Sequence, residues 1–252
     1  MNGDSADKLF QARIEDMYRK CERYYCPVFS AFLDERQCAE AEILCKRHGE
    51  AEYMLWGGFE EAQRKMLCVF DEYSKEYIAD EFPMKCLTFA FRREDRLSHR
   101  DFLGSFMAQR LKRETIGDII ISEGKAQVFV TDVAAKLIMS DISKIGRIGV
   151  RISDNEPFSL SAQQSFEDFG STVASLRLDC IVSAAAKISR ENAARLIRSE
   201  RISVNHLPVV SVSRELSEGD VITVRGSGKF ILNGVNGTTK KGRIHINLRK
   251  YK

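Results

Sequence analysis

Apolar residues recur at helix-like spacing over the first 48 positions, and short apolar runs replace that pattern in the positions that follow. The first pattern predicts two helices separated at Pro27, with Asp34 as the N-cap of the second helix. The short runs predict two strands, at residues 51–56 and 65–70. We therefore expect residues 1–82 to form an N-terminal α+β domain.

Between residues 83 and 160 the apolar pattern follows the order strand, helix, strand, strand, helix, strand. The four strands are expected at residues 86–91, 116–121, 126–130 and 148–152. Ser98 is expected to cap the first helix, and Thr131 or Asp132 the second, which should run through Ile145. The buried positions of this second helix are expected to be Val133, Leu137, Ile138 and Ile142. The order is that of a split β-α-β arrangement, so it predicts a central ferredoxin-like or RRM-like domain in an α+β chain.

Aromatic residues alternate on two of these central strands, at Phe89, Phe91 and Phe129. RRM domains use such positions to stack bases, but alternating aromatic residues on strands are more often part of a core, and we expect that here. Basic residues gather next to the strands instead. Lys112 and Arg113 precede a glycine turn and are a candidate secondary RNA contact. A loop adds a second cluster, consisting of Arg92, Arg93, Arg96, His99 and Arg100.

Residues 161–252 are expected to form a C-terminal domain that follows a polar linker at residues 153–165. A strand at 169–176 should lead into two short helices, the second of which is capped by Ser189 and ends near Ser199.

Strands follow these two helices, with a tight turn at Gly219-Asp220. In the last strand of the module, Ile222 and Val224 should face one way and the alternate residues the other.

The net charge of +3 conceals an uneven distribution along the chain. Residues 177–252 hold 15 Lys and Arg against six Asp and Glu, whereas residues 1–176 hold 24 against 30. No acidic residue follows Asp220. A basic end of this kind suits a polyanionic partner.

The basic residues of the C-terminal segment lie near the ends of its predicted helices and strands. Arginine predominates, and its guanidinium group matches phosphate oxygens in a bidentate manner. The start of the second helix also offers backbone N–H groups to a phosphate. The candidate RNA-binding residues are Arg177, Lys187, Ser189, Arg190, Arg195, Arg198, Arg201, Asn205, Arg225, Lys229, Lys240, Lys241 and Arg243. The last three belong to a basic tail that we expect to extend the electrostatic contact.

Other classes of protein find little support in the sequence. No run of eighteen apolar residues exists, and the first residues lack the pattern of a signal peptide, so a cytoplasmic protein without a membrane partner is expected. The seven cysteines are odd in number and contain no C-x-x-C pair, which argues against a metal site or a disulfide framework. We expect no cofactor and no small-molecule substrate.

Four short motifs in the basic segment are similar to the signature of the S4 RNA-binding domain. They are Arg177-Leu178-Asp179, Ser189-Arg190-x-x-Ala193-x-x-Leu196-Ile197, Val204-Asn205 and Gly219-Asp220-x-Ile222-x-Val224-Arg225. The resemblance covers about 55 residues and implies an S4 fold of the αL type that binds RNA. Glu200 departs from the pattern, because glycine is usual at that position.

Motifs outside this segment resemble the bacterial YlmH-like family of S4 proteins. They are Trp56-Gly57-Gly58-Phe59-Glu60-x-Ala62-x-Arg64, His99-Arg100-Asp101-Phe102-Leu103-Gly104 and Lys112-Arg113-Glu114-x-Ile116-Gly117-Asp118. The first departs from the family at Gln63, where glutamate is usual. The resemblance implies an RNA-binding factor that joins the large ribosomal subunit, contacts rRNA or tRNA, and serves in rescue or quality control of stalled translation.

Two alternatives to a binding protein stay open on the sequence. One is an S4-linked RNA-modifying enzyme such as a pseudouridine synthase, for which Asp179 is the residue that resembles a catalytic aspartate. Its position at a helix start favours a cap or an ion-pair partner instead. The other is a scaffold whose acidic front segment binds proteins.

Overall fold

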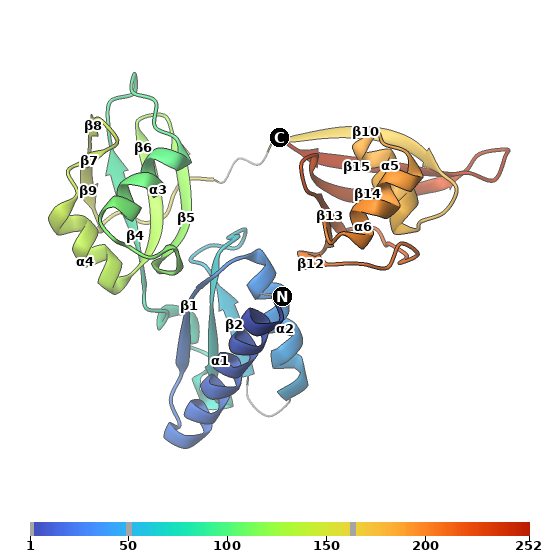
Figure 1. The fold of residues 1–252 in the computed structure, drawn as a ribbon. Coiled ribbons are helices and arrows are strands. Elements are labelled where there is room, and N and C mark those ends of the chain that lie inside the picture. Colours follow the sequence, from blue (N-terminus) through green and yellow to red (C-terminus); the bar gives the residue numbers. More distant parts are fainter. Residues whose placement is uncertain (1–2, 49–51, 162–164) are drawn as a thin grey trace. The chain divides into compact units, whose positions relative to one another are not determined.

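The computed structural model describes residues 3–48, 52–161 and 165–252, which form six α-helices and several antiparallel sheets (Figure 1). The chain is therefore of mixed α and β structure. It divides into two compact units, Met1–Ala162 and Gln163–Lys252. The first two predicted segments lie in the first unit and the basic segment lies in the second. None of the helices in the described part of the chain is long and apolar enough to cross a membrane.

The front of the first unit is a three-stranded sheet covered on one face by two helices. The helices are α1 (Gly3–Tyr24) and α2 (Glu35–His48), and the strands, in the order β1-β3-β2, are β1 (Val28–Leu33), β2 (Glu52–Trp56) and β3 (Lys65–Phe70). Asp34 caps α2 as expected, because its carboxylate accepts the N–H of Gln37 at 2.8 Å. Ala51, the first residue of the strand expected at 51–56, lies outside the described residues.

The interpretation of the first 48 residues as purely helical is wrong, because β1 lies between the two helices. Its sequence, Val-Phe-Ser-Ala-Phe-Leu, begins directly after Pro27 and is rich in residues that favour strands. Pairing with β3 buries Phe32 against one face of the sheet and Leu33 against the other. Because both faces of β1 contact apolar clusters, its sequence is a short apolar run. Periodicity alone does not distinguish such a run from part of a buried helix.

The central part of the first unit has the predicted order of elements. They are β4 (Met84–Ala90), α3 (His99–Ala108), β5 (Ile116–Ser122), β6 (Lys125–Thr131), α4 (Asp132–Asp141) and β9 (Arg151–Ser153). The sheet order is β5-β6-β4-β9, and both helices pack on one face of it. Ser98 forms a capping box with Asp101, and the Thr131 hydroxyl accepts the N–H of Ala134, so both expected caps are confirmed.

Two details of this part differ from the sequence prediction. Helix α4 ends at Asp141, and only Ile138 and Ile142 of its predicted buried positions are buried, whereas Val133 is 79% exposed. The small residues Ala134 and Ala135 take the contact with the sheet instead, because the short helix lies close to it. The strand expected at 148–152 is split at Val150 between β9 and a small hairpin, formed by β7 (Lys144–Ile145) and β8 (Ile148–Gly149).

The second face of the central sheet is closed by the protein itself. Phe129 projects from β6 into a cluster with Phe59 and Phe158, at ring-centroid distances of 5.5 and 5.1 Å. Beside it, the buried amide of Gln127 accepts the backbone N–H groups of Ser159 and Leu160. Part of the predicted linker at 153–165 is thus packed on the sheet, and its residues 162–164 lie outside the described residues.

Two of the three YlmH-like motifs, at residues 56–64 and 112–118, meet beside this closed face. The carboxylate of Asp118 accepts the backbone N–H groups of Gln63 and Arg64, at 2.6 and 3.3 Å for the shortest contacts. A Cβ atom on Gly58, whose φ is +95°, would lie 2.0 Å from the ring of Phe129. The glycines and the aspartate of these motifs therefore serve close packing between the front and central sheets.

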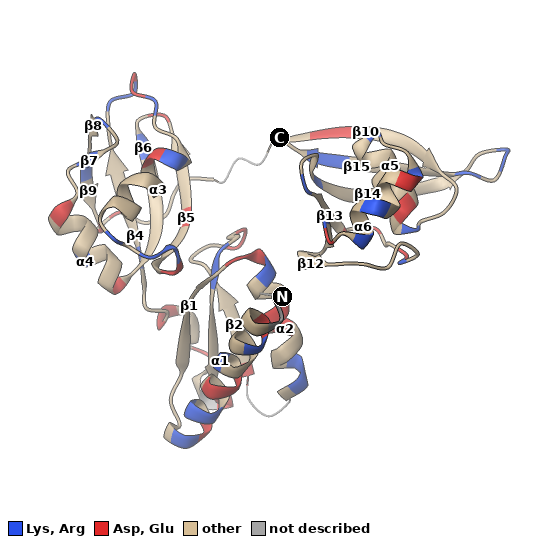
Figure 2. Cartoon of the chain, viewed as in Figure 1, with Lys and Arg blue, Asp and Glu red and all other residues tan. Residues whose placement is uncertain are grey.

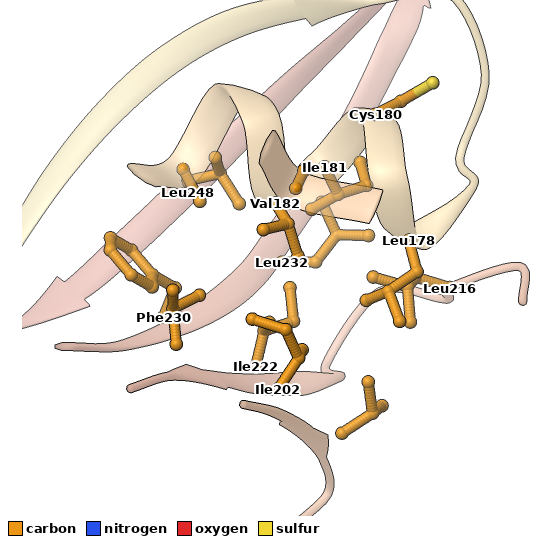
Figure 3. Packing of buried hydrophobic residues seen from close by; sticks show 14 of the residues in the cluster. Leu178, Cys180, Ile181, Val182, Ile202, Leu216, Ile222, Phe230, Leu232 and Leu248 are labelled. Atoms are coloured by element: carbon orange, nitrogen blue, oxygen red, sulfur yellow. The ribbon is translucent and has the colours of Figure 1, made fainter. Parts of the chain in front are cut away.

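The second unit is a six-stranded antiparallel sheet with two helices on one face (Figures 1 and 3). The helices are α5 (Leu178–Ala186) and α6 (Arg190–Arg198). The strands, in the order β10-β15-β14-β13-β11-β12, are β10 (Phe166–Val173), β11 (Ile202–Val204), β12 (Leu207–Pro208), β13 (Val221–Val224), β14 (Gly228–Thr238) and β15 (Ile244–Tyr251).

The core of the second unit lies between α5 and the inner face of this sheet. Leu178, Ile181 and Val182 of α5 lie over Phe230, Leu232 and Leu248 of β14 and β15 (Figure 3). Ile222 and Val224 are buried as expected. The tail was expected only as a basic extension, but it supplies β15, which pairs with β10 and β14. Strand β10 begins three residues before the expected position.

We expect Gly58→Ala to destabilise the first unit by about 3 kcal/mol, because the added methyl group meets a buried ring in a left-handed backbone conformation. Gly104→Ala is the matched control. Gly104 lies in α3 with open space around it, so alanine should leave stability unchanged or raise it by up to ~1 kcal/mol. Urea unfolding followed by the fluorescence of Trp56, the single tryptophan, measures both. Equal stability of the two variants would contradict this account of the closed face.

Candidate RNA interface

A buried carboxylate ties together the two short helices of the second unit. Asp179, at the start of α5, is 6% exposed. Its carboxylate accepts hydrogen bonds from Arg177 Nε at 3.1 Å and from Arg190 Nη2 at 2.6 Å, and also from the backbone N–H of Cys180. Burial by itself would raise the pKa of Asp179, but the hydrogen bonds from Arg190 and Arg177 outweigh it and hold the pKa below its usual value. Asp179 is thus the ion-pair partner that the sequence favoured.

The turn between α5 and α6 is closely specified by its side chains. Lys187 ends α5 in the left-handed conformation, and the hydroxyl of Ser183 donates to the carbonyl of Ile188 at 2.6 Å. The Ser189 hydroxyl accepts the N–H of Asn192, which confirms the expected N-cap. Lys187 and the start of α6 are therefore held at one corner, with the Lys187 side chain exposed to solvent.

Helix α6 presents a cationic outer face. Ala193 and Ile197 are buried, whereas Arg195 and Arg198 are exposed and border a shallow hollow with Glu191, Asn192 and Ser199. Arg195 donates to Asn192 at 3.2 Å. Figure 2 shows basic residues on this helix. Arg201, another candidate, follows the end of α6. Its carbonyl accepts the N–H of Arg225 at 3.0 Å, so the backbones of these two candidates lie side by side.

Glu200 lies between these groups, at the position where the S4 pattern has glycine. Its φ is +56°, so it adopts the left-handed conformation that glycine adopts without strain. The backbone N–H of Arg201 donates to Leu196 O, which closes the end of the helix. The departure from the pattern therefore leaves the shape of the turn in place.

The structure does not place every candidate of the second unit on this face. The side chain of Asn205 accepts the N–H of Val221 and donates to Asp220, so its amide holds a turn together. Lys229 lies 4.8 Å from the ring centroid of Tyr251 on β15. Lys240 and Lys241 are exposed in the turn between β14 and β15.

Arg243, which follows that turn, donates to the carbonyl of Thr172 on β10. The candidates therefore form a group around α6 and a second group along the β14–β15 hairpin.

Lys112 and Arg113, the candidate secondary RNA contact in the first unit, lie in different environments. The side chain of Lys112 is 78% exposed. Arg113 instead donates to the carbonyls of Ile116 and Gly117, and Arg64 donates to the carbonyl of Arg113. Burial, together with the nearby charge of Arg64, lowers the pKa of Arg113 to about 10. Arg113 is thus engaged inside the unit, which the sequence did not indicate, because the carbonyls it reaches are brought there by the fold.

The aromatic residues of the central strands are occupied in packing, as expected. Phe89 packs against Phe102 and Phe106 under α3, with ring-centroid distances of 5.2 and 6.0 Å. Phe91 packs against the same core, and Phe129 lies in the closed face described above. The buried rings of Phe89 and Phe129 are therefore not available for stacking with a base.

Potential metal ligands do not gather into a group in the described residues. All seven cysteines are free, and burial raises the pKa of Cys38 and Cys86 to about 11. No group of three or more potential metal ligands occurs among residues 3–48, 52–161 and 165–252. Asp179 is surrounded by arginine and backbone donors rather than placed in an open pocket.

A family model, a bacterial protein and a solved structure each match this chain. Residues 79–158 match a family model described as the putative RNA-binding domain in YlmH. The chain is 29% identical over 252 residues to the ribosome-associated protein quality control protein P2 of Bacillus subtilis (strain 168), covering 98% of this chain and 96% of that protein.

The structure of the cell division protein ylmH from Streptococcus pneumoniae covers 60% of this chain and 92% of its own, with a TM-score of 0.52 and 23% identity, which shows a shared fold. The resemblance to YlmH-like proteins is confirmed.

We expect Asp179→Asn to loosen α5 and α6 by about 2 kcal/mol, because two charge-assisted hydrogen bonds to a buried carboxylate are weakened. Since the pKa of Asp179 is lowered on folding, its contribution is present above the usual aspartate pKa of about 4 and is lost as the pH falls below it. Hydrogen exchange of the peptides covering residues 178–198, measured near pH 7, gives the change.

The control is Asp168→Asn. Asp168 also pairs with an arginine, Arg249, but its side chain is 59% exposed, so little change is expected. We call Asp179 with its two arginine partners, Arg177 and Arg190, the Asp179 clamp. Equal exchange rates around α5 and α6 in the two variants would show that this clamp does not hold the two helices together.

Proposed function

We propose that this protein binds structured RNA of the ribosome, with the outer face of α6 as its principal contact. The observation that carries the proposal is the Asp179 clamp. In this clamp two arginines neutralise the buried carboxylate of Asp179. The ion pairs hold the corner between α5 and α6, which carries Lys187 and Arg190. Arg195, Arg198 and Arg201 continue the same cationic surface. Arginine and lysine arranged on a rigid helix and turn suit phosphate contacts.

The matched relatives support RNA and the ribosome as partners. The family model over residues 79–158 is named for RNA binding, and the Bacillus subtilis relative is named for ribosome-associated quality control. From these we propose a role in rescue or quality control of stalled translation. The proposed partners are rRNA or tRNA on the large ribosomal subunit, in the cytoplasm, and no cofactor is proposed.

The proposed domain types follow from the arrangement of elements. For the second unit we propose an S4 domain of the αL type, supported by the helix-turn-helix followed by β11 and β13 and by the motif residues at its corners. For the central segment we propose an RRM-like domain, supported by the strand order β5-β6-β4-β9 with two helices on one face.

The surroundings of Asp179 favour a structural role for this residue over a catalytic one. Both carboxylate oxygens of Asp179 accept hydrogen bonds, from two arginines and one backbone N–H, and the residue is buried. We therefore propose a binding protein rather than an RNA-modifying enzyme.

The double variant Arg195→Gln, Arg198→Gln tests the proposed contact. If each arginine meets one phosphate, the slope of log K against log salt should fall by roughly 0.7–0.9 per residue, and RNA affinity should fall across sequences. Fluorescence anisotropy with a labelled RNA hairpin between 50 and 300 mM KCl (about the range in which such contacts dominate) measures both.

The control is Arg19→Gln, Arg23→Gln on α1, which changes the net charge by the same amount. Both side chains are exposed on the first unit. If the α6 variant and this control have the same affinity and slope, α6 is not the RNA contact.

A further inference from the structure

Four arginines surround the loop between β4 and α3, and we call Arg92, Arg93, Arg96 and Arg100 the arginine loop. All four are exposed. In residues 52–161 as described, none of them forms an ion pair or a side-chain hydrogen bond. Two lysines of the same segment are paired, Lys85 with Asp154 at 3.1 Å and Lys125 with Glu156 at 2.8 Å. The arginine loop is thus a site where positive charge is left open to solvent.

The loop is held in a defined shape by its backbone and its ends. The N–H of Phe91 donates to the carbonyl of Gly124, and Leu97 packs against the core under α3. Ser98 and Asp101 close the start of α3 with a capping box. A Cβ atom on Gly124 would lie 3.0 Å from Arg93 Cγ, so the stem of Arg93 rests against the β5–β6 turn. Little ordering of the chain is then needed when a ligand binds.

The charges in the loop favour an anion despite two acids within it. Residues 92–100 contain the four arginines together with Glu94 and Asp95, a balance of +2. The carboxylate of Asp101 is used by Ser98. Burial first, and then the nearby charge of Arg113, lower the pKa of His99, so the positive charge of the loop comes from its arginines.

The face that an RRM-like sheet would offer to bases is closed in this protein. Thr88, Gln127 and Phe129, at the centre of that face, are at most 4% exposed. The chain segment 157–160 and the Phe59 ring cover them. The centre of this sheet face is therefore not open to RNA, and exposed loops of the matched segment are left for such a contact.

We propose that the arginine loop is a second RNA-contact surface of this protein, which binds the phosphate backbone of a structured RNA. The proposal rests on the proposed RNA-binding function and places a contact in the first unit. Because the loop presents guanidinium groups and no exposed aromatic ring, it should recognise phosphates by charge rather than bases by stacking. The contact should be insensitive to base sequence.

The test is the full chain with Arg92, Arg93, Arg96 and Arg100 all changed to Gln. The probe is a labelled 20-base-pair RNA duplex, with a mixed and a scrambled sequence of the same composition. If two or more of the arginines meet phosphates, the salt slope should fall by about 1.5 or more, and Kd near 100 mM KCl should rise about tenfold for both sequences alike.

The charge-matched control changes Arg19, Arg23, Lys46 and Arg47 of α1 and α2 to Gln, which also removes four positive charges. Circular dichroism and urea unfolding check that both variants fold. A Kd and slope equal to those of the control would overturn the proposal.

Measuring the α6 variant in the same assay separates this proposal from the proposed function. If the α6 variant binds as wild type and the loop variant does not, the α6 contact fails and the arginine loop stands. If only the α6 variant is weakened, the arginine loop fails and the α6 contact stands. A loss confined to one duplex sequence would contradict recognition of the backbone by charge.

Discussion

Asp179 lies at the start of α5 and receives hydrogen bonds from Arg177 before it and from Arg190 at the start of α6. The arrangement of the second unit around its basic surface depends on this contact. Without a partner, a buried carboxylate would be strongly unfavourable. With two arginines it draws the ends of two helices together. Both guanidinium groups remain partly exposed, so the clamp neutralises the acid and still leaves positive charge at the surface.

The first unit follows a different constraint, which is that two sheets share one apolar cluster. Gly58 must be glycine because the ring of Phe129 occupies the space of a side chain. Asp118, on the same side, accepts two backbone N–H groups, and burial nevertheless raises its pKa. Because this packing uses the second face of the central sheet, it determines where that segment can meet a ligand. Exposed loops, and not the strands, are left for this purpose.

Much of the second unit could be predicted from the sequence because its signals are local. The cap at Ser189 and the alternation of Ile222 and Val224 depend only on neighbouring residues. Strand β1 and the role of Arg113 could not be predicted in the same way. The first depends on pairing with β3, and the second depends on the carbonyls of Ile116 and Gly117, which only the folded chain brings within reach. For the candidate site, the sequence identified the cations but not the separation of the hairpin group from the α6 group.

The central claim is that the protein meets ribosomal RNA through the corner and outer face of α6. Ultraviolet crosslinking of the full chain in cells, followed by mass spectrometry of nucleotide-bearing peptides, tests it most directly. The account predicts nucleotide adducts on peptides covering residues 187–201, carried by ribosomal RNA or tRNA and lost when Arg195 and Arg198 are changed to Gln. Adducts that avoid residues 187–201 while occurring elsewhere in the chain would contradict it.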